Sequence, residues 1–217
     1  MREAGGTELE DYASFIKVVF DSYKCKSRED LLHCIPIYDD EDLICGYLRP
    51  ITADFHSTLP GISALIAQWR NENPTLSAQS FLATEEGSKA WLDTLVIDRD
   101  DRLLFLILAL DGTRIGHIGF SSFDYEERCC EVDAVLRGEK SVYPGMMAFA
   151  LRALVNWGLC VLRLDTIQLR VFQDNSHAIR FYQRNGFLIE KQEEASEENT
   201  GKLHTVMRLD LDNWQFS

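Results

Sequence analysis

The sequence predicts an α/β (α+β) fold in which helices flank a mixed, mostly antiparallel central sheet. A continuous apolar run over residues 103–110 is followed by an Asp-Gly pair and a second run, RIGHIGFSS, a pattern that is typical of a β-hairpin. Later in the chain, apolar residues recur at helical spacing over 146–158, between segments that read as strands. Strands and helices in this order pack as a sheet covered by helices.

Residues 1–46 are expected to form a mainly helical N-terminal extension, and residues 47–217 the main domain. The extension contains apolar residues at spacings that suit a helix: Phe15, Val18, Val19, Leu31 and Leu32. Two roles are open for it, a cap over a substrate cleft and a contact in a homodimer. Its composition does not favour one over the other.

The main domain is expected to contain seven strands and four helices. The expected strands cover residues 47–51, 103–110, 114–122, 130–136, 166–172, 187–190 and 203–209. The expected helices cover residues 58–71, 84–97, 146–158 and 176–186, the first ending before Pro74 and the third at Gly158. The polar run 190–202 is interpreted as an exposed hairpin loop.

Charge and cysteine content exclude several classes of protein. The chain has 35 acidic and 22 basic side chains and a formal net charge of −13, which disfavours nucleic acid and anionic membrane surfaces and tolerates an amine substrate. The six cysteines lack the close spacings of zinc sites, so free thiols and no metal are expected. The first residues lack the features of a signal peptide, and no apolar run is long enough to span a bilayer, so a cytoplasmic location is expected.

The stretch DNSHAIRFYQRNGF, residues 174–187, has the features of a capped amphipathic helix. Its first residues, Asp174, Asn175 and Ser176, are all suited to cap a helix. Ala178, Phe181 and Tyr182 then share one face, and Gly186 suits the left-handed position that ends a helix: the helix is amphipathic and closed at both ends.

This stretch resembles the closing motif of the GNAT superfamily of N-acetyltransferases, which here corresponds to Asn175, Ala178, Phe181-Tyr182 and Gly186-Phe187. The preceding apolar strand and the element order also match, and the resemblance covers residues 46–209. It implies the GNAT acyl-CoA N-acyltransferase fold. It also implies transfer of an acetyl group from acetyl-CoA to a primary amine of a small molecule or a peptide.

The same resemblance implies a coenzyme A site between the fourth strand of the family pattern and the next helix. The stretch RGEKSVYPGMMAF supplies the candidate residues Arg137, Lys140, Tyr143, Gly145, Met146 and Met147. Amides at a helix N-terminus favour phosphate groups, and Gly145 permits their close approach. Tyr143 and Pro144 depart from the family pattern at this loop, since Tyr143 is bulky and Pro144 has no N–H.

Acetyl transfer needs a polarised carbonyl, a proton for the leaving thiolate and a neutral amine. The resemblance implies that the strand near 132–137 separates from the strand 166–172, with backbone amides near Val135 and Leu136 polarising the carbonyl. Asn175, Ala178 and Phe181 would contact the cofactor. Tyr182 would be the acid that protonates the sulfur.

Two candidates are open for the base that takes the ammonium proton. Alternation along the expected strand places Glu131, Asp133 and Val135 on one face. His117 lies on the preceding strand. A carboxylate and an imidazole can each take the proton through a water molecule, so Glu131 and His117 are both retained.

The acceptor is indicated only by a short segment, Trp69, Arg70 and Asn71, which looks like the WRN segment of GNAT enzymes that acetylate nucleotide-linked amino sugars. Trp69 and Arg70 are therefore candidate substrate-binding residues, because arginine binds phosphate and stacks on bases. Acetylation of protein N-termini, such as those of ribosomal proteins, is an alternative. A third reading is a GNAT domain that binds coenzyme A or a partner without catalysis.

Overall fold

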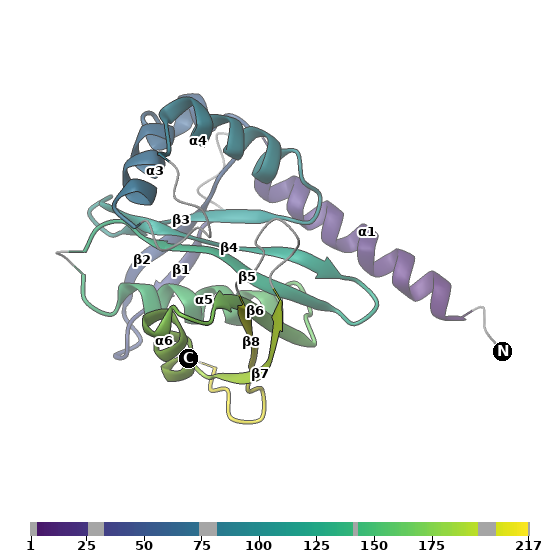
Figure 1. The fold of residues 1–217 in the computed structure, drawn as a ribbon. Coiled ribbons are helices and arrows are strands. Elements are labelled where there is room, and N and C mark those ends of the chain that lie inside the picture. Colours follow the sequence, from purple (N-terminus) through teal and green to yellow (C-terminus); the bar gives the residue numbers. More distant parts are fainter. Residues whose placement is uncertain (1–3, 26–32, 74–81, 141–142, 195–202, 217) are drawn as a thin grey trace.

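The computed structural model describes residues 4–25, 33–73, 82–140, 143–194 and 203–216, with the side chains from residue 9 onward. Eight strands form one sheet in the order β1-β2-β3-β4-β5-β6-β8-β7 (Figure 1). The strands are β1 (Ile35–Tyr38), β2 (Ile44–Pro50), β3 (Leu103–Ala109), β4 (Arg114–Asp124), β5 (Cys129–Arg137), β6 (Thr166–Phe172), β7 (Phe187–Glu194) and β8 (Leu203–Leu209). All neighbouring strands are antiparallel except β5 and β6, which confirms the mixed, mostly antiparallel sheet.

Helices cover both faces of this sheet, as the sequence predicts (Figure 1). They are α1 (Ala4–Lys24), α2 (Phe55–Thr58), α3 (Ile62–Asn71), α4 (Glu85–Leu92), α5 (Met146–Cys160) and α6 (Ser176–Arg184). A single π-helical turn, η3 (Asp93–Ile97), continues α4 where one regular helix was expected.

Strand β3 shows why a continuous apolar run forms a strand here. Leu103, Phe105 and Ile107 pack into a core with α1 and α5. Leu104 and Leu106 point the other way, into a core with α2, α3 and α4. Because successive side chains of a strand point to opposite faces, a strand covered on both faces is apolar at every position.

The N-terminal region differs from the sequence-based expectation. Helix α1 is present, and Tyr12, Ile16 and Phe20 form its buried face, whereas Val18 is 67% exposed. Leu31 and Leu32 lie outside the described residues. The mainly helical extension was expected to include a turn around Pro36 and Asp39, and here residues 35–46 form β1, a turn and the start of β2, so the expected boundary between 46 and 47 falls inside β2.

A turn and a short period-two pattern explain this β-hairpin. The carboxylate of Asp39 accepts hydrogen bonds from the backbone N–H groups of Glu41 at 2.9 Å and Leu43 at 3.0 Å, which closes the turn. Ile35 and Ile37 alternate into the core. Strand β1 is the edge of the sheet, a position where Pro36 is tolerated.

Two other expected elements also differ in extent. The helix expected over 58–71 is divided into α2 and α3 at Gly61, which has a left-handed φ of 74°. Strand β7 continues to residue 194 because it pairs with β8 up to the pair Glu194↔Leu203. Residues 190–194 of the expected hairpin loop are therefore strand, and residues 195–202 lie outside the described residues.

Strand β5 contains a bulge that determines which side chains face which side. His117 of β4 lies opposite Leu136, and Gly119 lies opposite Asp133, so the intervening β5 segment has one extra residue. Ala134 in this segment has a left-handed φ of 50°. Ala134 packs on the core beneath α2 to α4, whereas Val135 packs on the opposite core beneath α1 and α5. The expected shared face of Asp133 and Val135 is therefore wrong, because the bulge interrupts the alternation.

Strands β5 and β6 separate after a short parallel contact. Their pairing runs from Cys129↔Thr166 to Glu131↔Gln168 and then stops, although β5 continues to residue 137 and β6 to residue 172. The expected separation of these strands is thus observed. It opens the sheet at its centre.

We predict that Gly138→Ala destabilises the fold, because residue 138 has no room for a Cβ atom. A Cβ there would lie 2.0 Å from Cε2 of the Trp69 ring. Overpacking of this kind costs about 1–3 kcal/mol. Urea unfolding is the measurement, with Gly87→Ala on the exposed face of α4 as the control. Equal stability of the Gly138→Ala and Gly87→Ala chains would contradict the close packing of Trp69 on this backbone.

Candidate active site

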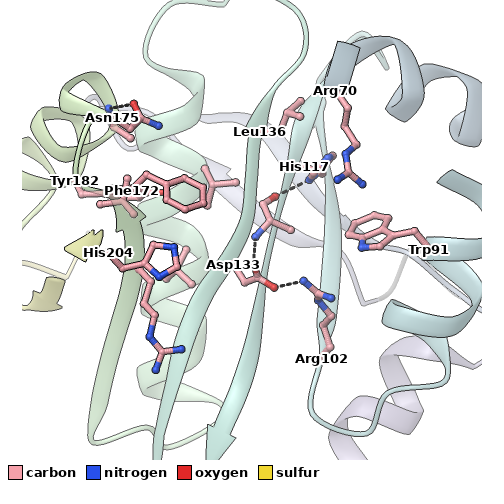
Figure 2. A pocket seen from close by; sticks show the side chains of 16 residues that line it. Arg70, Trp91, Arg102, His117, Asp133, Leu136, Phe172, Asn175, Tyr182 and His204 are labelled. Atoms are coloured by element: carbon pink, nitrogen blue, oxygen red, sulfur yellow. Dashed lines mark hydrogen bonds and ion pairs between the residues drawn. The ribbon is translucent and has the colours of Figure 1, made fainter. Parts of the chain in front are cut away.

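A cavity of about 300 Å³ lies where β5 and β6 separate. Figure 2 shows that its side chains form two groups on opposite sides of β5. One group comes from β6, β8 and α6, and the other from α3, α4, β4 and the residue before β3. The bulge of β5 lies between them. The cavity thus has two distinct walls, described in turn below.

The first wall is built on helix α6. Of the three possible caps, Asn175 is the one that caps the helix, and its Oδ1 accepts a hydrogen bond from the N–H of Ala178 at 3.1 Å. Asn175, Ala178 and Tyr182 line the cavity, whereas Phe181 packs on the core instead. Burial raises the pKa of Tyr182, so its hydroxyl stays protonated. None of the described residues hydrogen-bonds this hydroxyl.

The second wall contains His117, which is 4% exposed. Its Nδ1 donates to the carbonyl oxygen of Ala134 at 2.6 Å, and its Nε2 is buried with no hydrogen-bond partner among the described residues. The Trp69 and Trp91 rings flank the imidazole at centroid distances of 6.4 and 6.1 Å. Burial lowers the pKa of His117 to about 4, so the ring is neutral at pH 7 and Nε2 can only accept.

Two arginines lie beside this histidine. The guanidinium carbons of Arg70 and Arg102 are 5.7 and 5.6 Å from the centroid of the Trp91 ring. Arg102 forms an ion pair with Asp133, whose other carboxylate oxygen accepts from the N–H of Ala134 at 2.6 Å. The bulge residue therefore holds both His117 and the carboxylate that fixes Arg102 (Figure 2).

Comparison with known proteins identifies the family. Residues 47–188 match the family model described as an acetyltransferase (GNAT) domain. The chain belongs to the GNAT acetyltransferases. No match was found among curated proteins.

Solved structures of other proteins have the same fold as this GNAT acetyltransferase. A probable GNAT-family acetyltransferase from Chromobacterium violaceum aligns with a TM-score of 0.65 and 16% identity, over 85% of this chain and 87% of that chain. A spermidine N-acetyltransferase from Vibrio cholerae, solved in complex with CoA and spermine, aligns with a TM-score of 0.57 and 16% identity, over 75% of this chain and 93% of that chain. At these identities the likeness supports the fold and not the acceptor.

GNAT acetyltransferases take their acetyl group from acetyl-CoA, and the separated strands fit that molecule. Val135 and Leu136 line the cavity along the part of β5 that has no pairing to β6, so this edge of the strand is available to a ligand, whereas its other edge pairs with β4. Gly145 begins α5 with a left-handed φ of 84°, and a Cβ there would lie 2.9 Å from the Phe149 ring. Both the positive φ and the lack of room for a Cβ atom favour glycine at this position. A glycine at the start of a helix also lets the backbone approach a phosphate group closely.

The remaining residues of the expected phosphate loop lie outside the cavity. Arg137 donates from Nε to the carbonyl of Glu139 at 3.0 Å, and from Nη2 to the carbonyl of Lys140 at 3.4 Å. The hydroxyl of Tyr143 donates to Asp111 at 2.5 Å, in the β3–β4 turn. Met146 and Met147 bury their side chains in the core, and the N–H of Met146 donates to the carbonyl of Tyr143 at 3.3 Å. Residues 141–142 lie outside the described residues.

Two other expected site residues also do not line the cavity. Glu131 forms an ion pair with Arg170 at 2.9 Å and accepts from Gln168 at 3.4 Å, at the last point where β5 and β6 still pair. Burial raises the pKa of Glu131. Trp69 is 4% exposed and reaches the site only through its contacts with His117 and Gly138, whereas Arg70 lines the cavity directly.

Sequence reasoning missed several lining residues: Trp91, Arg102, Asp133, Arg170, Phe172 and His204. A tryptophan in the polar helix α4 was the one available signal, since a large aromatic residue there needs a packing partner. The other five come from β5, β6, β8 and the residue before β3, and they meet only in the folded chain. Within the described residues, no helix combines the length and apolar character needed to cross a membrane.

We predict that His117 makes the fold sensitive to acid. Its pKa is lowered from 6.5 in the unfolded chain to about 4 in the folded chain. Between these values the unfolded chain binds a proton that the folded chain does not, so the free energy of unfolding decreases as the pH falls. We expect His117 to account for about 2 kcal/mol of the loss between pH 7 and pH 5.

Urea unfolding of three chains at both pH values is the measurement. The His117→Gln chain should lose less stability than the wild type over this interval. The control is His177→Gln, because His177 is exposed on α6, and this chain should lose as much stability as the wild type does. Equal losses in the wild type and in His117→Gln would show that His117 is not held neutral by burial.

Proposed function

We propose that this GNAT acetyltransferase transfers the acetyl group of acetyl-CoA to a primary amine by direct attack. One observation carries the proposal: the cavity that opens between β5 and β6 contains a buried tyrosine on one wall and a buried neutral histidine on the other. An acid and a hydrogen-bond acceptor on opposite sides of the reacting carbon are what aminolysis of a thioester needs. Bound acetyl-CoA supplies the activated acetyl group.

Tyr182 is proposed as the acid. Its raised pKa keeps the proton on the hydroxyl, and the absence of a hydrogen-bond partner among the described residues leaves that proton available to a leaving sulfur. Tyr182 is 8% exposed, and in a buried place a hydrogen bond to a developing negative charge is strong.

His117 is proposed to position the amine. Its Nδ1–H is committed to Ala134, so its Nε2 accepts an N–H of the acceptor and turns the nitrogen lone pair toward the acetyl carbon. With a pKa of about 4, the ring does not retain a proton at pH 7, and the proton leaves to water. Glu131, the other candidate base, is held by Arg170 and lies outside the cavity, which favours His117.

The coenzyme is proposed to lie against the α6 wall and the start of α5. The backbone of Val135 and Leu136 would face the pantetheine arm and the carbonyl, with Asn175 and Ala178 beside it. Backbone amides at the start of α5, after Gly145, would face the phosphates, because unpaired N–H groups at a helix N-terminus attract anions. The cationic side chains of Arg137, the last residue of β5, and Lys140, which follows it, add positive charge near this loop.

The first test compares three classes of acceptor, and it also tests the alternative that the domain binds coenzyme A without catalysis. Amino-sugar nucleotides are motivated by Arg70 in the cavity, N-terminal peptides by the acidic chain, and polyamines by the solved structures with this fold. The measurement is the release of free thiol from acetyl-CoA with each class. Turnover with any of them supports the proposal. Binding of acetyl-CoA by thermal shift, without turnover of any amine, would support the non-catalytic reading.

We predict that Tyr182→Phe lowers turnover about 100-fold, because general acid catalysis contributes about that much or more. The affinity for acetyl-CoA should change little, since the ring and its packing remain. Thiol release and calorimetric binding of acetyl-CoA measure the two effects separately. Tyr47→Phe is the matched control, because Tyr47 is 36% exposed on β2 and lies outside the cavity. Unchanged turnover in Tyr182→Phe would remove this residue from the acid role.

A further inference from the structure

We infer that the acceptor carries an anionic group, a carboxylate or a phosphate, and that Arg70 and Arg102 bind this group beside Trp91. The inference rests on the proposed function and specifies the substrate class of the same cavity. It concerns the wall that the coenzyme does not occupy, on the far side of the β5 bulge from Asn175 and Tyr182 (Figure 2).

The charge of the cavity is opposite to that of the chain. The chain has a formal net charge of −13. Yet three arginines line the cavity, and Asp133 is the one acidic residue among its described lining residues. Of these arginines, Arg170 forms ion pairs with Glu131 and Glu193, so the excess of positive charge lies on the second wall. On the second wall, Arg70 and Arg102 face a single carboxylate and a histidine that is neutral at pH 7. A local excess of positive charge in an acidic protein selects for an anion and disfavours a polycation.

The two guanidinium groups are also fixed in position. Both stack against the same Trp91 ring, and Arg102 is held further by Asp133 and by its hydrogen bond to the carbonyl of Leu95 at 3.1 Å. Burial and the nearby charge of Arg102 lower the pKa of Arg70, so two like charges lie close together in a half-buried place. An anion between them relieves this repulsion, and planar guanidinium groups bind carboxylates and phosphates with paired hydrogen bonds.

The place proposed for the amine indicates that the anionic group belongs to the acceptor molecule. Arg70 and Arg102 both lie over the Trp91 ring, whose centroid is 6.1 Å from that of His117, so both guanidinium groups lie near the imidazole that accepts the amine. A molecule with its amine at His117 therefore has its other end beside the two arginines. A simple polyamine would place a second cation there.

The test uses pairs of amines that differ only in the anionic group. Phosphoethanolamine is compared with ethanolamine, and phenylalanine with phenylalaninamide, so that the first pair reports a phosphate and the second a carboxylate. Spermidine is the polycation. Thiol release gives kcat/KM, and calorimetry on the protein saturated with coenzyme A gives binding without requiring turnover. We expect the anionic member of at least one pair to exceed its partner and spermidine by 10-fold or more.

Substitutions of Arg70 test whether this residue causes the preference for anionic amines. Arg70→Gln should reduce the ratio between the anionic and neutral members about 10-fold, and Arg70→Lys should restore part of it, because a lysine keeps the charge and loses the planar geometry. Arg152→Gln is the matched control, since Arg152 pairs with Asp40 at 3.2 Å on the surface of α5 and should leave the ratio unchanged. A role of Arg70 in folding alone would lower both members equally.

The outcomes separate this inference from the proposed function. Turnover of spermidine or of the neutral amines as fast as the anionic ones overturns the inference and leaves amine acetylation in place. Preferential calorimetric binding of the anionic members without any turnover supports the inference and contradicts the proposed function. Equal or absent binding of both members of both pairs overturns the inference.

Discussion

The candidate active site depends on one irregular position, the bulge at Ala134 in β5. Its carbonyl holds Nδ1 of His117, and its N–H holds the carboxylate of Asp133, which in turn fixes Arg102. A regular strand would direct Asp133 and Ala134 to opposite faces. The left-handed conformation of Ala134 is uncommon for a residue with a Cβ atom, and it is tolerated here because three side-chain contacts are satisfied around it.

The separation of β5 from β6 creates the cavity that the bulge faces. If the two strands paired along their whole length, the backbone of Val135 and Leu136 would be occupied by β6 and the cavity would be absent. Because pairing ends at Glu131↔Gln168, a helix-built wall with Tyr182 and an arginine-rich wall with His117 face each other across one strand. Burial shifts the pKa values of these two residues in opposite directions, lowering that of His117 and raising that of Tyr182, as is common at sites of acid–base chemistry.

The sequence predicted the elements whose signals are local and missed those that depend on the folded sheet. The stretch 174–187 was read correctly as a capped helix because the cap at Asn175 and its apolar face lie within a few turns of one another. On the second wall the sequence identified His117 and Arg70 but not Trp91 and Arg102, which reach it from separate elements. The face of Asp133 was assigned wrongly because a bulge shifts the alternation by one residue and leaves no mark in the pattern. The β1–β2 hairpin was missed because its alternation spans only two buried isoleucines.

The strand order also bears on how the sheet assembles. Strands β3, β4 and β5 follow one another in the chain and pair as neighbours, so closing their loops costs little conformational entropy. Strand β6 reaches β5 only after the whole of α5, and β8 must then enter between β6 and β7. The two halves of the sheet are joined by three residue pairs at the seam between β5 and β6. That seam is the narrowest hydrogen-bonded junction in the sheet, so motion of one half against the other would widen or narrow the cavity while the remaining ladders stay intact.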